Sequence, residues 1–333
     1  MKMRGRESDR EEALLQVLRG GAFYAIDELE RSLNCGADDL ARMVDELRSR
    51  GYDIERRPGS GYRMVETPEL VLPADIRAGL HTEVVGGRIV GYGRVGSTNA
   101  AALELARRGA PEGTLVIADH QTRGRGRLGR RWESPPGAGI WMSLILRPAV
   151  PPERAPAITL VAAASVTQAI RAVGLPVLVR WPNDVIVASG RKICGILSEM
   201  EGAAESVQHI VVGIGINVNQ RPDDFDPSIR GTATSLFAEL GRTVPRPDLA
   251  AGVLNDFDTA YHRFCRGGLA PLLPRIRECS SLLGEHVAVW IEKQEVFGQV
   301  LDIDDWGRLV LRDDHGMIQQ LPAGEVRKIE LSD

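Results

Sequence analysis

Residues 123–131 read Arg-Gly-Arg-Gly-Arg-Leu-Gly-Arg-Arg, and the interpretation of the whole chain starts from this stretch. Five of its nine residues are arginine, although the 333-residue chain has a formal net charge of -4. Its three glycines permit close backbone approach or positive φ, and arginine supplies paired donors to phosphate or carboxylate oxygens. The stretch favours a loop that wraps an anionic ligand. The alternative is a solvated loop that binds nothing in particular, or RNA non-specifically.

The same stretch matches the GxGxxG pattern of dinucleotide-binding turns, but its surroundings exclude that fold. A Rossmann turn follows its strand directly, opens a helix and has an acidic residue about 20 positions further on. Here six residues, 119–124, lie between the expected strand and Arg125-Gly126, and Pro135-Pro136 blocks a helix. No acidic residue lies between Glu133 and Glu153. A Walker loop is excluded as well, because no GK[ST] sequence follows.

The segments around the loop predict a mixed α/β domain. Apolar runs typical of strands alternate with stretches whose apolar residues recur at helical spacing. We expect strands at 114–118, 142–146 and 209–213, and helices at 100–108, 157–173 and 246–264.

The N-terminal part predicts a winged helix-turn-helix module, in the order helix, helix, helix and hairpin. We expect helices at 12–18, 25–33 and 37–50 and strands at 52–56 and 61–65. The third helix opens with Asp38 and Asp39, which would repel DNA at the usual reading positions. Phosphate contacts are still expected from four arginines, so DNA binding stays open beside a purely stabilising role. These arginines are Arg42, Arg48, Arg56 and Arg57.

The C-terminal part predicts a small β-barrel, because short alternating strands are separated by turns rich in Asp and Gly. The strands are expected at 287–291, 297–303, 309–312 and 318–321. We therefore divide the chain into a winged helix-turn-helix at 1–66, a linker at 67–82, a central α/β domain at 83–280 and a barrel at 281–333. The fold class is α+β.

The composition excludes several classes of protein. With 43% hydrophobic and 26% charged residues, the chain is typical of globular proteins. We expect no segment to span a membrane, because a spanning helix needs about 20 apolar residues, and we predict a cytoplasmic protein. The four cysteines and six histidines show no metal-binding spacing. No built-in metal site is expected.

Three further motifs surround the arginine loop. Gly96-Ser97-Thr98-Asn99 precedes it, His120-Gln121-Thr122 leads into it, and Arg180-Trp181-Pro182-Asn183-Asp184 follows, with Lys192 behind. This set resembles the biotin protein ligases, specifically the bifunctional ligase-repressor type, over nearly the whole chain. The GRGRxGR loop combined with WPND and a later lysine is far more specific than any one piece.

The resemblance implies a function and an architecture. The chain would form biotinyl-5'-AMP from biotin and ATP, with Mg²⁺ on the ATP, and transfer biotin to a lysine of biotin carboxyl carrier protein. It would have a class II synthetase-like central domain and an SH3-like barrel, and it would form a homodimer. Operator DNA would be a further partner of a biotin-responsive repressor.

The resemblance also assigns roles to residues. Biotin contacts fall on Ser97, Thr98, Asn99, Gln121, Arg125, Gly126, Arg127 and Lys192. Nucleotide contacts are assigned to Arg127, Arg130, Trp132, Asn183 and Lys192, and catalysis to Lys192, Arg125 and Arg127. Hydroxyl and amide groups suit the ureido ring of biotin, although Ser97-Thr98-Asn99 also fits a helix N-cap. Trp141 fits a pocket wall or the core equally well.

The chain departs from the family pattern at two positions, where Arg180 replaces the common lysine and Leu128 replaces a basic residue. Arg180 keeps the charge. The segment 217–234 lies where relatives have a loop over the adenylate, but its sequence assigns no contacts. Two other functions stay open, namely a biotin-sensing transcription factor without transfer activity and a ligase for another acyl group such as lipoate.

Overall fold

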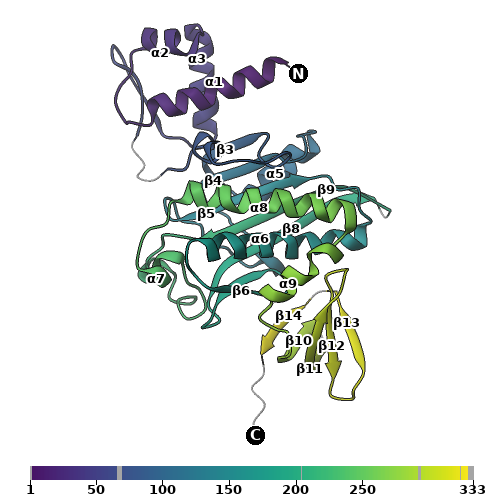
Figure 1. Ribbon diagram of the computed structural model, residues 1–333. Coiled ribbons are helices and arrows are strands. Elements are labelled where there is room, and N and C mark those ends of the chain that lie inside the picture. The colour runs from purple at the N-terminus through teal and green to yellow at the C-terminus, as the bar shows by residue number, and fades with distance from the viewer. Residues whose placement is uncertain (1, 66–69, 204, 292–293, 323, 329–333) are drawn as a thin grey trace.

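The computed structural model describes residues 2–65, 70–203, 205–291, 294–322 and 324–328. Figure 1 shows three parts along the chain: an N-terminal group of helices, a central layered body and a C-terminal sheet. The expected linker begins with residues 67–69, which lie outside the described ranges.

The N-terminal part contains three helices and a hairpin, in the expected order. The elements are α1 (Lys2–Leu18), α2 (Ile26–Leu33), α3 (Ala37–Ser49), β1 (Ile54–Arg57) and β2 (Gly61–Met64). They enclose a small core of their own, in which Leu14, Leu29 and Leu40 are fully buried. The helix α1 begins ten residues earlier than predicted. Asp38 and Asp39 lie in the first turn of α3, where carboxylates also favour the helix dipole.

A seven-stranded mixed sheet forms the central body, in the order β3-β4-β5-β9-β8-β7-β6. Its strands are β3 (Ile89–Val95), β4 (Leu115–Gln121), β5 (Gly139–Leu146), β6 (Val177–Arg180), β7 (Asp184–Val187), β8 (Lys192–Ala203) and β9 (Ser206–Asn217). Among the neighbouring strands of this sheet, β3 and β4 pair in parallel and all the other pairs are antiparallel. The predicted strands are confirmed, but β3, β6 and β7 were not foreseen, and β8 was foreseen only as a hairpin strand around Lys192.

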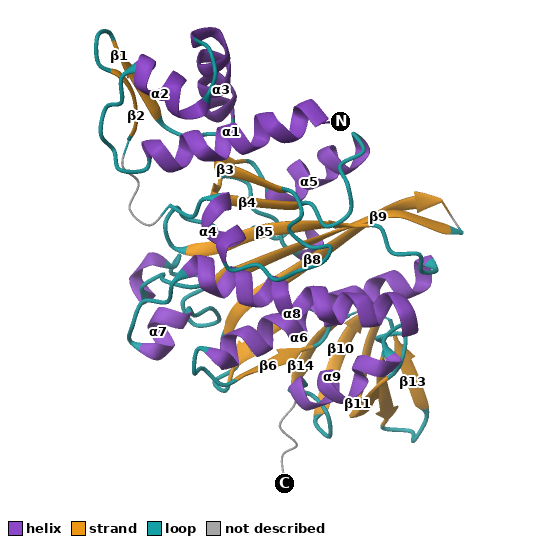
Figure 2. Ribbon diagram, turned by 45° about the horizontal axis from the view of Figure 1, so that its top comes forward, coloured by secondary structure: helices purple, strands orange, loops and turns teal. Residues whose placement is uncertain are grey.

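Helices cover both faces of this sheet (Figure 2). Leu115 and Ile117 pack with α6 (Ile158–Ala172) and α8 (Arg246–Gly267), whereas Val116 packs with α5 (Thr98–Arg107) on the other face. The central body also contains three shorter helices: α4 (Pro73–Ala78), α7 (Leu236–Leu240) and α9 (Leu273–Cys279).

One segment, Pro152–Ala172, is long and apolar enough to cross a membrane, contrary to our expectation that no segment approaches this length. In the structure, 72% of the apolar 18-residue stretch within this segment is buried inside the protein. Its apolar surface is therefore used for packing in the central core.

The C-terminal part is a five-stranded antiparallel sheet, in the order β13-β12-β11-β10-β14. Its strands are β10 (His286–Ile291), β11 (Gln294–Ile303), β12 (Leu309–Asp313), β13 (Ile318–Leu321) and β14 (Glu325–Lys328). The four predicted strands are confirmed, and β14 was missed because four mostly polar residues carry no apolar pattern. Among the described residues β13 and β14 lie at opposite edges, so the strand pairing does not show a closed barrel.

Two of the contacts between the outer parts and the central body lie close to the expected site. At one edge, the main chain of Gly51 packs so closely on Gly93 that a Cβ at position 93 would lie 2.5 Å from the Gly51 oxygen. The strand β3 that carries Gly93 runs directly into Ser97. At the other side, the buried indole of Trp181 donates a hydrogen bond to the carbonyl of Gly307, at 2.9 Å. Both contacts therefore lie next to the motifs singled out in the sequence.

Candidate active site

A cavity of about 390 Å³ brings the sequence motifs together. Its volume lies within the usual range for small-molecule sites, roughly 300–1,000 Å³. The motif residues that line it are Ser97, Thr98, Asn99, Gln121, Arg125, Gly126, Arg127, Arg130, Trp132, Asn183 and Lys192. Every residue that we assigned to biotin or nucleotide from the sequence therefore borders one space.

The Ser97-Thr98-Asn99 segment forms one polar wall of the cavity. Ser97 occupies the N-cap position of α5, as predicted, but its side chain makes no capping hydrogen bond. The backbone N–H of Thr98 donates to Oε1 of Gln121 at 2.8 Å. The hydroxyl of Ser143 donates to Oδ1 of Asn99 at 2.6 Å and lies within hydrogen-bond distance of Oγ1 of Thr98, at 2.8 Å. This buried network fixes the orientation of each group, because unsatisfied polar atoms are costly in such a place.

Glycines form the floor of the cavity on the neighbouring strands β8 and β9. A Cβ added to Gly213 would lie 2.0 Å from Oδ1 of Asn99. A Cβ on Gly215 would lie 2.5 Å from the Trp132 indole nitrogen, and one on Gly195 would lie 2.9 Å from Lys192. The floor must therefore lack side chains for the wall residues to pack over it.

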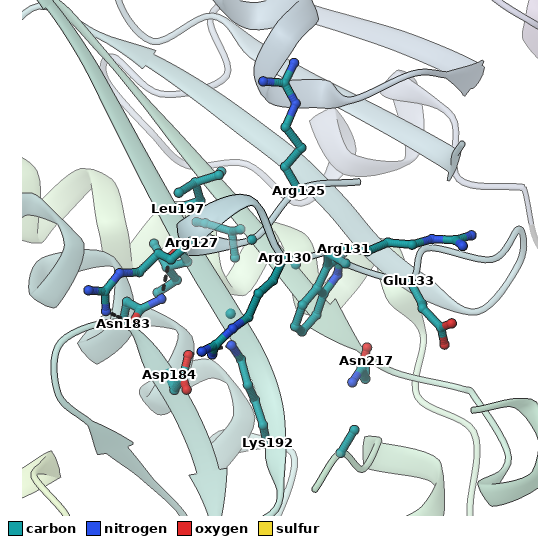
Figure 3. A pocket seen from close by; sticks show the side chains of 18 of the residues that line it. Arg125, Arg127, Arg130, Arg131, Glu133, Asn183, Asp184, Lys192, Leu197 and Asn217 are labelled. Atoms are coloured by element: carbon teal, nitrogen blue, oxygen red, sulfur yellow. Dashed lines mark hydrogen bonds and ion pairs between the residues drawn. The ribbon is translucent and has the colours of Figure 1, made fainter. Parts of the chain in front are cut away.

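The arginine loop reaches across the cavity through two of its five arginines. Arg127 donates to Oδ1 of Asn183 at 2.9 Å and to the carbonyl of Gly324 at 3.2 Å. Arg130 forms an ion pair with Glu325, on the C-terminal sheet. Figure 3 shows both guanidinium groups on the side of Asp184 and Lys192. These contacts tie the loop to the C-terminal part of the chain.

The other arginines of the loop point elsewhere. The side chain of Arg125 is directed away from Lys192 in Figure 3, and Arg125 also borders a second hollow beside Arg107 and Glu199. Arg123 packs its guanidinium against Gly96. Arg125 therefore borders the same cavity as Lys192 although its side chain points away from that lysine. A role for Arg125 at the site stays a prediction, carried by its position on the cavity wall.

Lys192 lies opposite the loop at the start of β8, the hairpin position predicted for it. Its Nζ is 2.6 Å from Oδ1 of Asp184, and Nη2 of Arg180 is 3.0 Å from the other oxygen of this carboxylate. One carboxylate thus holds two cations at the cavity. Partly buried cations require a negatively charged partner, and the Asp184 carboxylate is that partner for both Arg180 and Lys192.

The two tryptophans have different roles. Trp132 lines the cavity, and the Nζ of Lys192 lies 5.2 Å from the centre of its ring. Trp141 is fully buried and packs edge-on against Trp132, with ring centres 6.4 Å apart. Of the two interpretations open for Trp141, the core position is the one observed.

Two family models and several curated proteins match this chain. The family model described as "Biotin/lipoate A/B protein ligase family" matches residues 92–217, and that described as "Biotin protein ligase C terminal domain" matches residues 282–328. A Bacillus subtilis protein named bifunctional ligase/repressor BirA is 37% identical over 90% of this chain and 92% of its own length. The chain belongs to the biotin protein ligase family. The Escherichia coli protein of the same name is 32% identical, over 94% of this chain and 95% of its own length.

A solved structure of the family agrees with this assignment. The biotin protein ligase from Aquifex aeolicus in complex with biotin and ATP has 28% sequence identity to this chain. It aligns over 74% of this chain and 100% of its own length, with a TM-score of 0.63.

Several residues of the site were not assigned from the sequence. The motif that contains Asp184 predicts no role for this residue, and no sequence pattern points to Ser143 or Glu325. Ser143 sits in an apolar strand, so its position on β5 beneath Asn99 emerges only from the sheet register. Glu325 reaches the cavity because the C-terminal sheet docks there, which no local pattern encodes. Leu128, one of the two departures from the family pattern, is 75% exposed and lies outside the cavity lining.

Among the residues that the structure describes, no group of three or more His, Cys, Asp or Glu side chains is placed to hold a metal ion.

The glycine floor yields a first prediction. We expect Gly213→Ala to lower the free energy of unfolding by about 1–3 kcal/mol, the usual cost of overpacking. Asn99 has little room to yield, because Ser143, Leu197 and Glu199 all bond to it. Urea denaturation measures the loss. As a control, Gly252→Ala within α8 meets its nearest atom at 3.9 Å, so a matching loss there would contradict the floor assignment.

Proposed function

We propose that this chain is an ATP-dependent biotin protein ligase, which forms biotinyl-5'-AMP and then transfers biotin to a lysine of biotin carboxyl carrier protein. One observation carries the proposal: the polar wall at 97–99, the arginine loop and Lys192 enclose the same cavity. The names of relatives aligned over most of the chain support it.

Activation of a carboxylic acid by ATP sets the demands on the site. A carboxylate oxygen of biotin attacks the α-phosphorus, the bond to the bridging oxygen breaks, and pyrophosphate leaves. Both reactants are anions, so they repel each other unless fixed cations surround them. We assign this role to Arg127, Arg130 and Lys192, whose present partners are amide or carboxylate oxygens that substrate oxygens would replace.

The two substrates would occupy different ends of the cavity. Ser97, Thr98, Asn99 and Gln121 offer donors and acceptors to the ureido ring of biotin, while Arg125 and Gly126 border the same region. Trp132 and Asn183 would contact the nucleotide together with Arg127, Arg130 and Lys192. Asn183 is fixed by its own hydrogen bond to the carbonyl of Ile196, at 2.9 Å.

Transfer requires no nucleophile from the enzyme. The neutral amine of a carrier lysine attacks the acyl carbon, an amide forms, AMP leaves with one carboxylate oxygen, and the amine proton goes to solvent. The protein must keep water from the mixed anhydride until the carrier arrives.

The other proposals concern organisation and partners. We assign residues 1–66 to a winged helix-turn-helix, 67–82 to a linker, 83–280 to a class II synthetase-like catalytic domain and 281–333 to an SH3-like domain. The chain would act as a homodimer in the cytoplasm, as part of the same family-based proposal. Mg²⁺ would enter with ATP as part of the substrate, because its preferred oxygen ligands are abundant on the phosphates.

Biotin is favoured over lipoate as the acyl group. One matched family model covers both ligase types, but the matched C-terminal model and the aligned Aquifex aeolicus structure carry biotin in their names. An intact Lys192 and arginine loop favour a ligase over a biotin sensor without transfer activity. Incubation with ATP, Mg²⁺, a carrier domain and labelled biotin or lipoate separates the three functions, since only a biotin ligase labels the carrier with biotin.

The cation assignment yields a second prediction. We expect Arg127→Ala and Lys192→Ala each to slow adenylate formation by about 100-fold or more, as for removal of one charge-stabilising donor. Arg125→Ala is expected to have a smaller effect, since its side chain points away from Lys192. The rate is measured as the amount of labelled biotinyl-AMP formed per unit time. Arg108→Ala, an exposed residue on the surface paired with Glu104, is the control and keeps the wild-type rate. Unchanged turnover in the first two variants would remove the site assignment.

We also propose that the chain represses transcription by binding operator DNA. The helix and hairpin order of residues 2–65 supports this, as do the names of the bifunctional relatives. The four arginines expected to contact DNA phosphates differ in the partners that they already have within the protein. Arg48 donates two hydrogen bonds to the carbonyl of Ile54, and Arg42 pairs with Asp39, whereas Arg57 stacks 4.3 Å from the Phe23 ring. Arg56 is exposed on β1 and lies 5.8 Å from the Tyr62 ring.

The hairpin yields a third prediction. We expect Arg56→Ala to weaken binding to the promoter of the biotin operon and to reduce the slope of log K against log salt by about 1, the signature of one lost phosphate contact. Gel shifts at several stated salt concentrations measure the slope. Absence of any shift at low salt would refute the repressor proposal, and an unchanged slope would refute the contact.

A further inference from the structure

The segment 221–234 closes one side of the cavity, although its sequence assigned it no contacts. After a short 3-10 turn at Pro222–Asp224, it follows an irregular path to the start of α7. The residues of this segment that line the cavity are Asp224, Phe225, Ile229, Thr232 and Ala233. Phe225 is 6% exposed, so this segment buries an aromatic side chain at the site.

The end of the segment is bonded directly to Lys192. The backbone N–H of Lys192 donates to the carbonyl of Thr232 at 2.7 Å, and the N–H of Thr234 donates to the carbonyl of Lys192 at 2.9 Å. These two bonds form a short parallel bridge centred on Ala233. The conformation of the segment and the position of the Lys192 backbone are therefore coupled.

One side chain braces the irregular part of the segment. Arg230 donates from Nε to the carbonyl of Phe225 and from Nη2 to the carbonyl of Asp223, both at 2.9 Å. Its Nη1 is also 3.5 Å from the carboxylate of Asp223. The planar guanidinium thus spans the segment and fixes the two carbonyls that flank Asp224 and Phe225. A rigid fork of donors suits this task better than a lysine.

We propose that Arg230 is a positioning residue for adenylate formation, which holds the 221–234 segment against the cavity and against Lys192. This inference rests on the proposed ligase function. Arg230 does not line the cavity itself, so it acts through Phe225 and through the bridge at Lys192. Its side chain is 44% exposed, so its removal is expected to loosen this segment and not to unfold the protein.

The test separates nucleotide binding, biotin binding and release of the intermediate. We expect Arg230→Ala to raise KM for ATP and to speed the release of biotinyl-AMP, each by about tenfold, the effect of losing one charge-assisted hydrogen bond. Affinity for biotin alone and the Tm should stay at wild-type values, since the 97–99 wall lies on another part of the cavity. Arg230→Lys should give intermediate values, because one ammonium reaches fewer carbonyls at once.

The matched control is Arg242→Ala, which removes another exposed arginine that donates to a backbone carbonyl, that of Val173 at 2.8 Å, away from the cavity. It should leave both quantities unchanged. If Arg230→Ala releases biotinyl-AMP at the wild-type rate, this inference is overturned but the proposed function is not. The same holds if biotin affinity and Tm fall as much as retention of biotinyl-AMP does. Absence of any adenylate from the wild-type chain would instead overturn the proposed function.

Discussion

Four cationic side chains converge on one partly buried cavity, and the rest of the site is built around the cost of that arrangement. Arg127, Arg130, Arg180 and Lys192 would repel one another without oxygen partners. Asn183, Asp184 and Glu325 provide such partners in the structure. A ligand with several negative oxygens would replace them at little rearrangement, because the cations already have their positions.

This concentration of charge requires contributions from distant parts of the sequence. The strand β3 delivers Ser97, β8 begins at Lys192, and the C-terminal sheet brings Glu325 to the loop. Trp181, which lies two residues before Asn183, anchors this sheet through its hydrogen bond to Gly307. The C-terminal part therefore forms a wall of the site and is more than an appended domain. The N-terminal part packs against β3, so it too touches an element that leads into the cavity.

Much of this could be predicted because local patterns encode it. The apolar strands of the central sheet, the helices at its surface and the order of the motifs were readable from the sequence. The β3 strand contains two glycines and an arginine and therefore lacks an apolar run, and β14 is mostly polar. The direction of each arginine in the loop depends on which partner lies nearby, so sequence placed Arg125 and Arg127 together although their side chains diverge. Arg230 was missed because its partners are backbone carbonyls.

The central claim is that a carboxylate oxygen of biotin becomes bonded to the α-phosphorus of ATP in this cavity. It is tested by supplying biotin labelled with ¹⁸O in its carboxyl group, together with ATP, Mg²⁺ and a carrier domain, and by recording the mass of the AMP released. If biotinyl-AMP is the intermediate, the AMP carries one labelled oxygen for each biotin transferred. Biotinylated carrier accompanied by unlabelled AMP would contradict it.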